Sequence, residues 1–89
     1  MNRPRYLPII NPKDHNAFWR LINPDFPDTY DEWLKLHSKE RAEFERLGET
    51  VIDVQVYPNE FAGFCEARGC ASTLKSLEDF AIEKAPRNN

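Results

Sequence analysis

The sequence predicts an α+β fold: a helix-rich single small domain with the element order β-α-α-β-α-α and a minimal two-stranded sheet packed against helices. Two short runs rich in aliphatic and β-branched residues, 5–10 and 51–56, have the character of strands. Each is followed by two segments whose apolar residues recur at helical spacing. Eighty-nine residues suffice for one domain, expected to span 1–89 with loose termini at 1–4 and 86–89.

The first predicted strand, RYLPII, contains Pro8. Proline has no N–H to donate to a sheet, so this strand should lie at an edge or carry a bulge. The helix after it should begin near Asn11, a favourable cap residue, with Pro12 in its first turn. A stiff linker with two prolines, 23–28, separates this helix from the next.

The longest predicted helix begins at Thr29. Thr29 and Glu32 form the T-x-x-E pattern of a capping box, in which each residue satisfies a backbone N–H of the other. An apolar stripe at helical spacing follows, and Gly48 should end the helix in the left-handed conformation. In the second strand, Asp53 and Gln55 alternate with valine and isoleucine, so one strand face should meet water.

Two more helices are predicted after the second strand. Pro58 should open the first, over 58–68, and Ser72 should cap the second, which ends before Pro86. Two strands alone are marginal in water, so the sheet needs helices packed on it or strands from a second chain. The sequence leaves open whether the strands run parallel or antiparallel.

Both cysteines lie at the predicted end of a helix, on either side of Gly69. If Gly69 is the left-handed residue beyond that helix, Cys65 and Cys70 occupy the two positions that this glycine motif joins by an apolar contact. We therefore predict that both thiols are structural, since free cysteine behaves as a small buried hydrophobe. The sulfurs should be near enough to oxidise to a disulfide, but the C-x-x-C spacing of thiol oxidoreductases is missing.

The sequence contains no recognisable pattern for a cofactor, a metal or a catalytic group. Both glycine-rich phosphate loops are missing, and a zinc site built from the histidines and cysteines lacks paired ligand spacing. His37 lies on the apolar stripe of the long helix, where we expect one hydrogen-bond partner at the edge of the core. His15 should be exposed in the first turn of its helix. We therefore assign no catalytic, cofactor-binding or metal-binding residue.

The charge and hydropathy of the chain limit the classes of partner that we expect. The net charge is −3, and an acidic chain has no field to attract phosphate backbones, so nucleic acid is an unfavoured partner. No apolar run is long enough to cross a membrane, and the N-terminal segment does not suit a signal peptide. We therefore expect a cytoplasmic protein without a membrane partner.

By elimination, the expected function is non-catalytic binding of another macromolecule, as a regulatory or adaptor protein with an unknown protein partner. Aromatic residues near loops and an exposed strand edge would form its interaction surface. The residues expected there are Tyr6, Phe26, Tyr30, Val54 and Tyr57. One alternative is nucleic-acid binding through the C-terminal helical pair 58–85, and a second is a small thiol or acid–base enzyme. Strand 51–56 also offers an edge through which two chains could pair as a homodimer.

Overall fold

The computed structural model describes residues 4–85 of the chain. In chain order its elements are β1 (Arg5–Ile9), the 3₁₀ turn η1 (Pro12–Asp14), α1 (His15–Ile22), α2 (Tyr30–Arg46), β2 (Val51–Gln55), α3 (Pro58–Arg68) and α4 (Leu74–Lys84). The order of strands and α-helices is the predicted one, and the α+β class is confirmed. The predicted loose termini, apart from Pro4, lie outside the described residues.

The two strands run parallel, in register from Arg5 opposite Val51 to Ile9 opposite Gln55. A parallel pair needs a long crossover, which α1 and α2 supply. At the start of the pair, the Arg5 N–H donates to the Thr50 carbonyl over 2.7 Å. Because backbone groups alternate in direction along a strand, Arg5, Leu7 and Ile9 face β2.

The outer edge of β1 therefore presents the peptide groups of Tyr6 and Pro8. The missing N–H of Pro8 falls on this side, where the strand has no neighbour, so the proline removes no hydrogen bond from the sheet. The prediction of an edge strand is confirmed. Among residues 4–85, no hydrogen bond reaches the backbone N–H or carbonyl of Tyr6.

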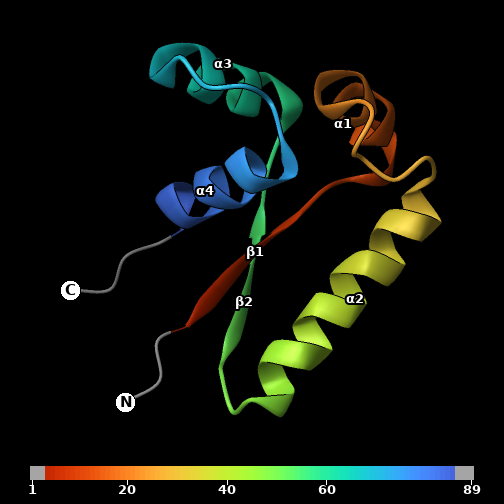
Figure 1. Cartoon of the computed structure of the whole chain (residues 1–89), viewed down its shortest axis with the longest axis vertical. Coiled ribbons are helices and arrows are strands. Elements are labelled where there is room, and N and C mark those ends of the chain that lie inside the picture. The colour runs from red at the N-terminus through yellow and green to blue at the C-terminus, as the bar shows by residue number, and fades with distance from the viewer. Residues whose placement is uncertain (1–3, 86–89) are drawn as a thin grey trace.

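Helices pack on both faces of the sheet, although Asp53, on the face predicted to meet water, remains exposed. Figure 1 shows α2 on one side of the strands and α4 on the other, and both helices contact both strands. The side expected to be wet carries Asp53, and α2 lies over it, so that His37 and Arg41 reach its carboxylate. Alternation along the strand shows that β2 has two different faces, but only the packing decides which face a helix covers.

The largest fully buried side chains lie beyond the carboxyl ends of the strands, where α1 meets α3 (Figure 1). Phe18 and Phe61 are fully buried, with ring centroids 6.0 Å apart. Phe26, from the linker before α2, lies 6.2 Å from Phe18 on its other side. Aromatic pairs at this separation bury much area for few residues, which suits so small a domain.

The helix caps follow local sequence with three corrections. Thr29 caps α2 by accepting from the Glu32 N–H over 3.0 Å, but within residues 4–85 the Glu32 side chain does not return the bond that a full capping box needs. The cap of α4 is Thr73 rather than Ser72, and it forms a capping box with Ser76. Asn11 makes no side-chain cap, because the helical segment after it starts with the 3₁₀ turn η1 before it becomes α-helical.

The end of α3 has the predicted glycine motif. Gly69 has φ 63° and ψ 31°, and its N–H donates to the Glu66 carbonyl, while the Cys70 N–H donates to the Cys65 carbonyl over 3.0 Å. Cys65 is buried, but Cys70 is exposed, so the prediction of two buried thiols is wrong for Cys70. The motif brings the two residues together, and it is the packing of α3 on α4 that buries Cys65 alone. Gly48, after α2, is also left-handed, with φ 83°.

Candidate functional site

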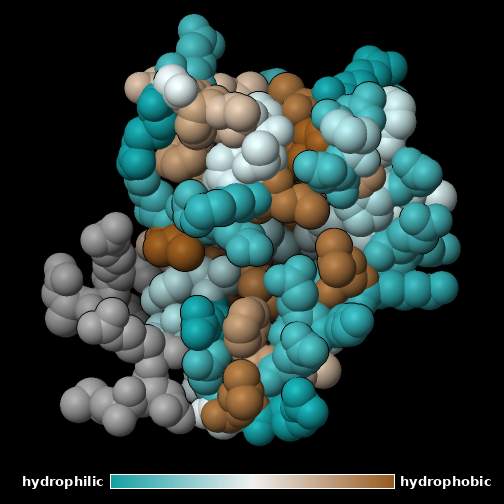
Figure 2. Space-filling model, viewed as in Figure 1, coloured by the Kyte–Doolittle hydropathy of each residue, from teal (hydrophilic) through white to brown (hydrophobic). Residues whose placement is uncertain are grey.

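A groove runs along the outer edge of β1, where α2 and α4 approach each other. Its deeper part is a cavity of about 150 Å³, whose floor is formed by β1 and whose walls are formed by the two helices. The lining residues are Leu7, Pro8, Trp33, Leu36, His37, Glu40, Leu74, Leu77 and Glu78. On the face seen in Figure 2, apolar side chains reach the surface between α4 and α2, with hydrophilic side chains on either side.

A wider and more open hollow of about 380 Å³ continues the groove towards the start of β1. It is lined by Pro4, Arg5, Tyr6, Leu7, Phe44, Glu78 and Ile82. Leu7 and Glu78 line both parts, so they mark the junction. Because the open peptide group of Tyr6 faces this side of β1, the groove combines apolar walls with a free backbone donor and acceptor.

Two carboxylates stand on the walls of the deep cavity, Glu40 on α2 and Glu78 on α4. Neither forms a hydrogen bond or ion pair with another residue of the range 4–85. Partial burial raises the pKa of Glu40, and the nearby charge of Glu78 raises it further, while His37 opposes the shift. The free protein therefore holds two acidic groups close together over an apolar surface.

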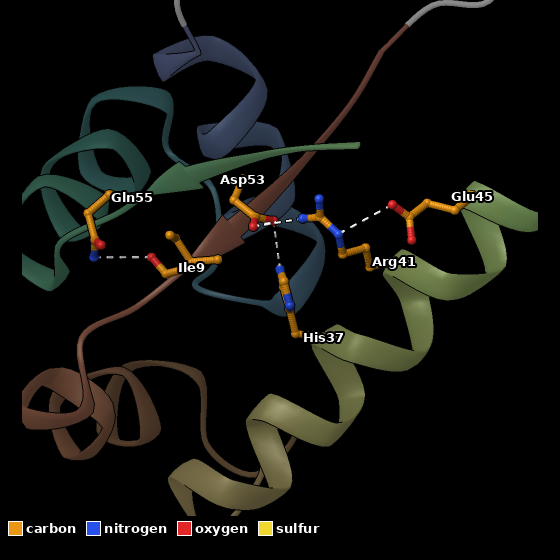
Figure 3. Close-up of polar contacts among 6 residues, drawn as sticks. All are labelled: Ile9, His37, Arg41, Glu45, Asp53 and Gln55. Carbon is orange, nitrogen blue, oxygen red and sulfur yellow. Dashed lines mark hydrogen bonds and ion pairs between the residues drawn. The ribbon is translucent and has the colours of Figure 1, made fainter. Parts of the chain in front are cut away.

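A polar network lies behind the groove, between α2 and β2 (Figure 3). Its centre is Asp53, whose carboxylate accepts from Arg41 over 2.7 Å and lies 3.0 Å from the His37 Nε2. Arg41 also pairs with Glu45 one turn along α2, at 3.6 Å. The His37 ring stacks on Trp33, with centroids 5.3 Å apart, so the network fixes one wall of the cavity.

The geometry of this network is that of a structural tie. His37 is nearly buried and has one hydrogen-bond partner, as predicted. A nucleophile–base pair would need a hydroxyl or thiol on the imidazole, and no serine, threonine or cysteine among the described residues makes a hydrogen bond to His37. Asp53 is held by two cationic or polar donors from one helix, which anchors α2 on the sheet.

The residues predicted to form an interaction surface do not share one environment. Phe26 and Val54 are core residues, 2% and 6% exposed, so a partner cannot reach them and their assignment is wrong. Tyr30 is half-buried, stacked on Trp33, and its hydroxyl lies 3.5 Å from the Ile10 carbonyl. Tyr57 is exposed but lies under the Lys84 ammonium. Tyr6 alone of the five lines the groove.

The remaining histidine and the exposed thiol offer little chemistry. His15 is half-buried rather than exposed as predicted, because its Nε2 lies 2.9 Å from the Pro27 carbonyl and its ring packs on Phe26. Desolvation and the neighbouring Cys65 raise the pKa of the Cys70 thiol, which disfavours the reactive thiolate. Within residues 4–85, no group of three histidine, cysteine or acidic side chains could hold a metal ion.

The C-terminal helical pair has its basic side chains engaged. Arg68 pairs with Glu83, Lys84 with Glu60 at 2.6 Å, and Lys75 with Asp79 at 3.9 Å. These are the three basic residues between positions 58 and 85. A nucleic-acid surface would need such groups turned towards phosphates, so this pairing weighs against that alternative.

Comparison with known proteins finds no matching family model, no similar curated protein and no similar solved structure. None of the helices in the described part of the chain has the length and apolar character required to cross a membrane. Function therefore has to be argued from the chain's own geometry.

Sequence reasoning missed the groove, although Glu40 offered a signal. Glu40 falls on the apolar stripe of α2, between Trp33 and Phe44 at helical spacing. A charged residue is almost never fully buried unless it is paired, so a glutamate within the stripe indicates that this part of the stripe is not closed off from water. Its neighbour Glu78 gave no such signal, since nothing local indicates that α4 faces α2.

Proposed function

We propose that this protein acts without catalysis, as a regulatory or adaptor protein that binds a short segment of a partner protein in the groove between α2 and α4. The observation that carries the proposal is the apolar cavity at the outer edge of β1. We place this activity in the cytoplasm, where free thiols such as Cys65 and Cys70 persist.

The size of the cavity suits one apolar side chain. A dry cavity of about 150 Å³ lined by aliphatic and aromatic residues can hold a benzene ring. The cavity has this volume and presents Leu36, 37% exposed, at its mouth. A leucine or phenylalanine side chain of the partner would fill it, gaining about 1.5–3 kcal/mol from burial.

The open peptide group of Tyr6 supports an extended partner segment. A chain lying along the outer edge of β1 can donate to its carbonyl and accept from its N–H, which is how exposed strands bind peptides. Pro8 limits this pairing to a short stretch, because its nitrogen cannot donate. Few backbone bonds and one buried side chain predict affinity in the micromolar range or weaker.

Peptide selection tests the proposal. A random heptapeptide library is selected on the immobilised protein, and the recovered peptides are synthesised and titrated into a Trp19→Phe variant. In that variant Trp33 is the remaining tryptophan and lies in the cavity wall, so its fluorescence reports binding there. We expect micromolar peptides that change the Trp33 emission.

A pair of leucine variants provides the control. Leu36→Tyr narrows the mouth of the cavity and should weaken binding at least tenfold. Leu47→Tyr makes the same change at a residue 70% exposed beyond the end of α2, outside the groove, and should leave binding unchanged. If no peptide is recovered, or if both variants bind the recovered peptides equally, the groove is not the binding site.

We also propose that a second copy can pair along the outer edge of β2. The peptide groups of Val51, Asp53 and Gln55 face away from β1, and no backbone hydrogen bond reaches them within residues 4–85. An open parallel edge of this kind tends to find another strand. This contact would lie on the opposite edge of the sheet from the groove, so both could be occupied together.

A further inference from the structure

We propose that the bound segment carries a lysine or arginine next to its apolar side chain, and that this cation is held between Glu40 and Glu78. The inference rests on the proposed function and names the chemistry of the partner. Its basis is the pairing of an apolar cavity with two carboxylates from facing helices.

Neither carboxylate forms an ion pair with another residue of the range 4–85. His37, whose charge lowers the pKa of Glu40, and Arg41 are both held by Asp53, and Lys75 points to solvent with its ammonium 3.9 Å from Asp79. Arg5, at the far end of the groove, donates to Glu49 and lies over the Phe44 ring. The site thus has an excess of negative charge that the described part of the chain does not neutralise.

Glu40 and Glu78 stand on the path into the cavity. Glu78 lines both parts of the groove and Glu40 lines the deep part, so a ligand that enters the cavity must pass close to both. Two like charges in a partly desolvated place are unfavourable in the free protein, and the raised pKa of Glu40 reflects this. A cation between them would remove the repulsion and make charge-assisted hydrogen bonds.

The two carboxylates should make the groove select its ligand by charge. An acidic segment would add a third negative charge to the groove, and a purely apolar segment would leave both carboxylates facing its low-dielectric side chain. Lysine and arginine are suited to the site because their aliphatic stems can lie on Leu36 and Leu74 while the charged head reaches the carboxylates.

The test uses peptides recovered from the heptapeptide selection. We expect nearly all groove-dependent sequences to contain a basic residue within two positions of a leucine, phenylalanine or similar side chain. For the tightest such peptide, replacing the basic residue by norleucine should weaken binding about tenfold to the native protein. The same replacement should change binding less than twofold to a Glu40→Gln, Glu78→Gln double variant.

Glu66→Gln serves as the matched charge control, since Glu66 is exposed on α3 and does not line the groove. It should leave the norleucine effect at about tenfold. If recovered peptides are lost in Leu36→Tyr but carry no basic residue, or if norleucine weakens binding equally in native and double-variant proteins, the cation site is refuted and the groove function stands. If no groove-dependent peptide exists, both are refuted.

Discussion

The two glycines of the α3 region provide a sharp test of the fold, because the same substitution should act in opposite directions. Gly69, at the end of α3, has φ 63° and ψ 31°. Gly63 lies inside the same helix with ordinary helical geometry. At both positions a Cβ built on the backbone would meet no other atom within 4 Å, so packing does not contribute to either change.

The expected magnitudes follow from the backbone alone. An alanine at Gly69 must adopt the left-handed region, which costs roughly 1–2 kcal/mol for an L-residue. An alanine at Gly63 removes the entropic penalty of glycine in a helix and should stabilise by roughly 0.5–1 kcal/mol. The two variants should therefore differ by about 2 kcal/mol in their free energy of unfolding.

Urea denaturation followed by far-ultraviolet circular dichroism measures this difference. Thermal unfolding should separate the variants by roughly 10 °C, since 1 kcal/mol corresponds to about 4–8 °C for a domain of this size. The native protein lies between them as the reference. If Gly69→Ala is as stable as the native protein, Gly69 is not held in the left-handed conformation and the assigned end of α3 is wrong.

Three further predictions concern other parts of the molecule. Cys65→Ala should lower the free energy of unfolding by roughly 1–3 kcal/mol because it leaves a cavity in the core, whereas Cys70→Ala should barely change it. A thiol reagent should modify Cys70 first, and equal reactivity of the two thiols would contradict the burial of Cys65. Glu40→Gln should raise the free energy of unfolding at pH 7 by about 0.5 kcal/mol, a small effect because the side chain is only partly buried and water screens its charge. Folding raises the pKa of Glu40, so its charged form destabilises the native state, and the gain should vanish as the pH falls to the pKa of the unfolded chain; a gain that persists at pH 3 has another cause. Sedimentation equilibrium should show a dimer at micromolar concentration, which Gln55→Pro should abolish by removing an N–H from the outer edge of β2; a monomer across the range contradicts pairing there.

The boundaries of the helices were largely predictable because their causes lie within a few residues of the chain. Thr29 caps the helix that follows it through a bond to the Glu32 N–H, Pro58 opens the next through its fixed φ, and Gly69 ends it in the left-handed conformation. The cap of α4 was displaced by one residue, since Ser72 and Thr73 are both suitable and the partner Ser76 selects the second.

The candidate site was much less predictable. Tyr6 was expected on an interaction surface and does line the groove, and His37 was expected to have a single partner. Phe26 and Val54 were assigned to the surface because aromatic residues near loops and valines in a strand occur both in cores and in interfaces. Their environment depends on the element that covers them, which neighbouring residues do not specify.

The sequence by itself determined the kind of each element, its ends and the need for helices over a marginal sheet. Local hydrogen bonds and the spacing of apolar residues carry that information. Only the tertiary structure decided that the strands are parallel, that helices pack on both sheet faces and that Glu40 faces Glu78. These depend on contacts between residues far apart in the chain, whose partners are set by the packing of whole helices and not by the residues beside them.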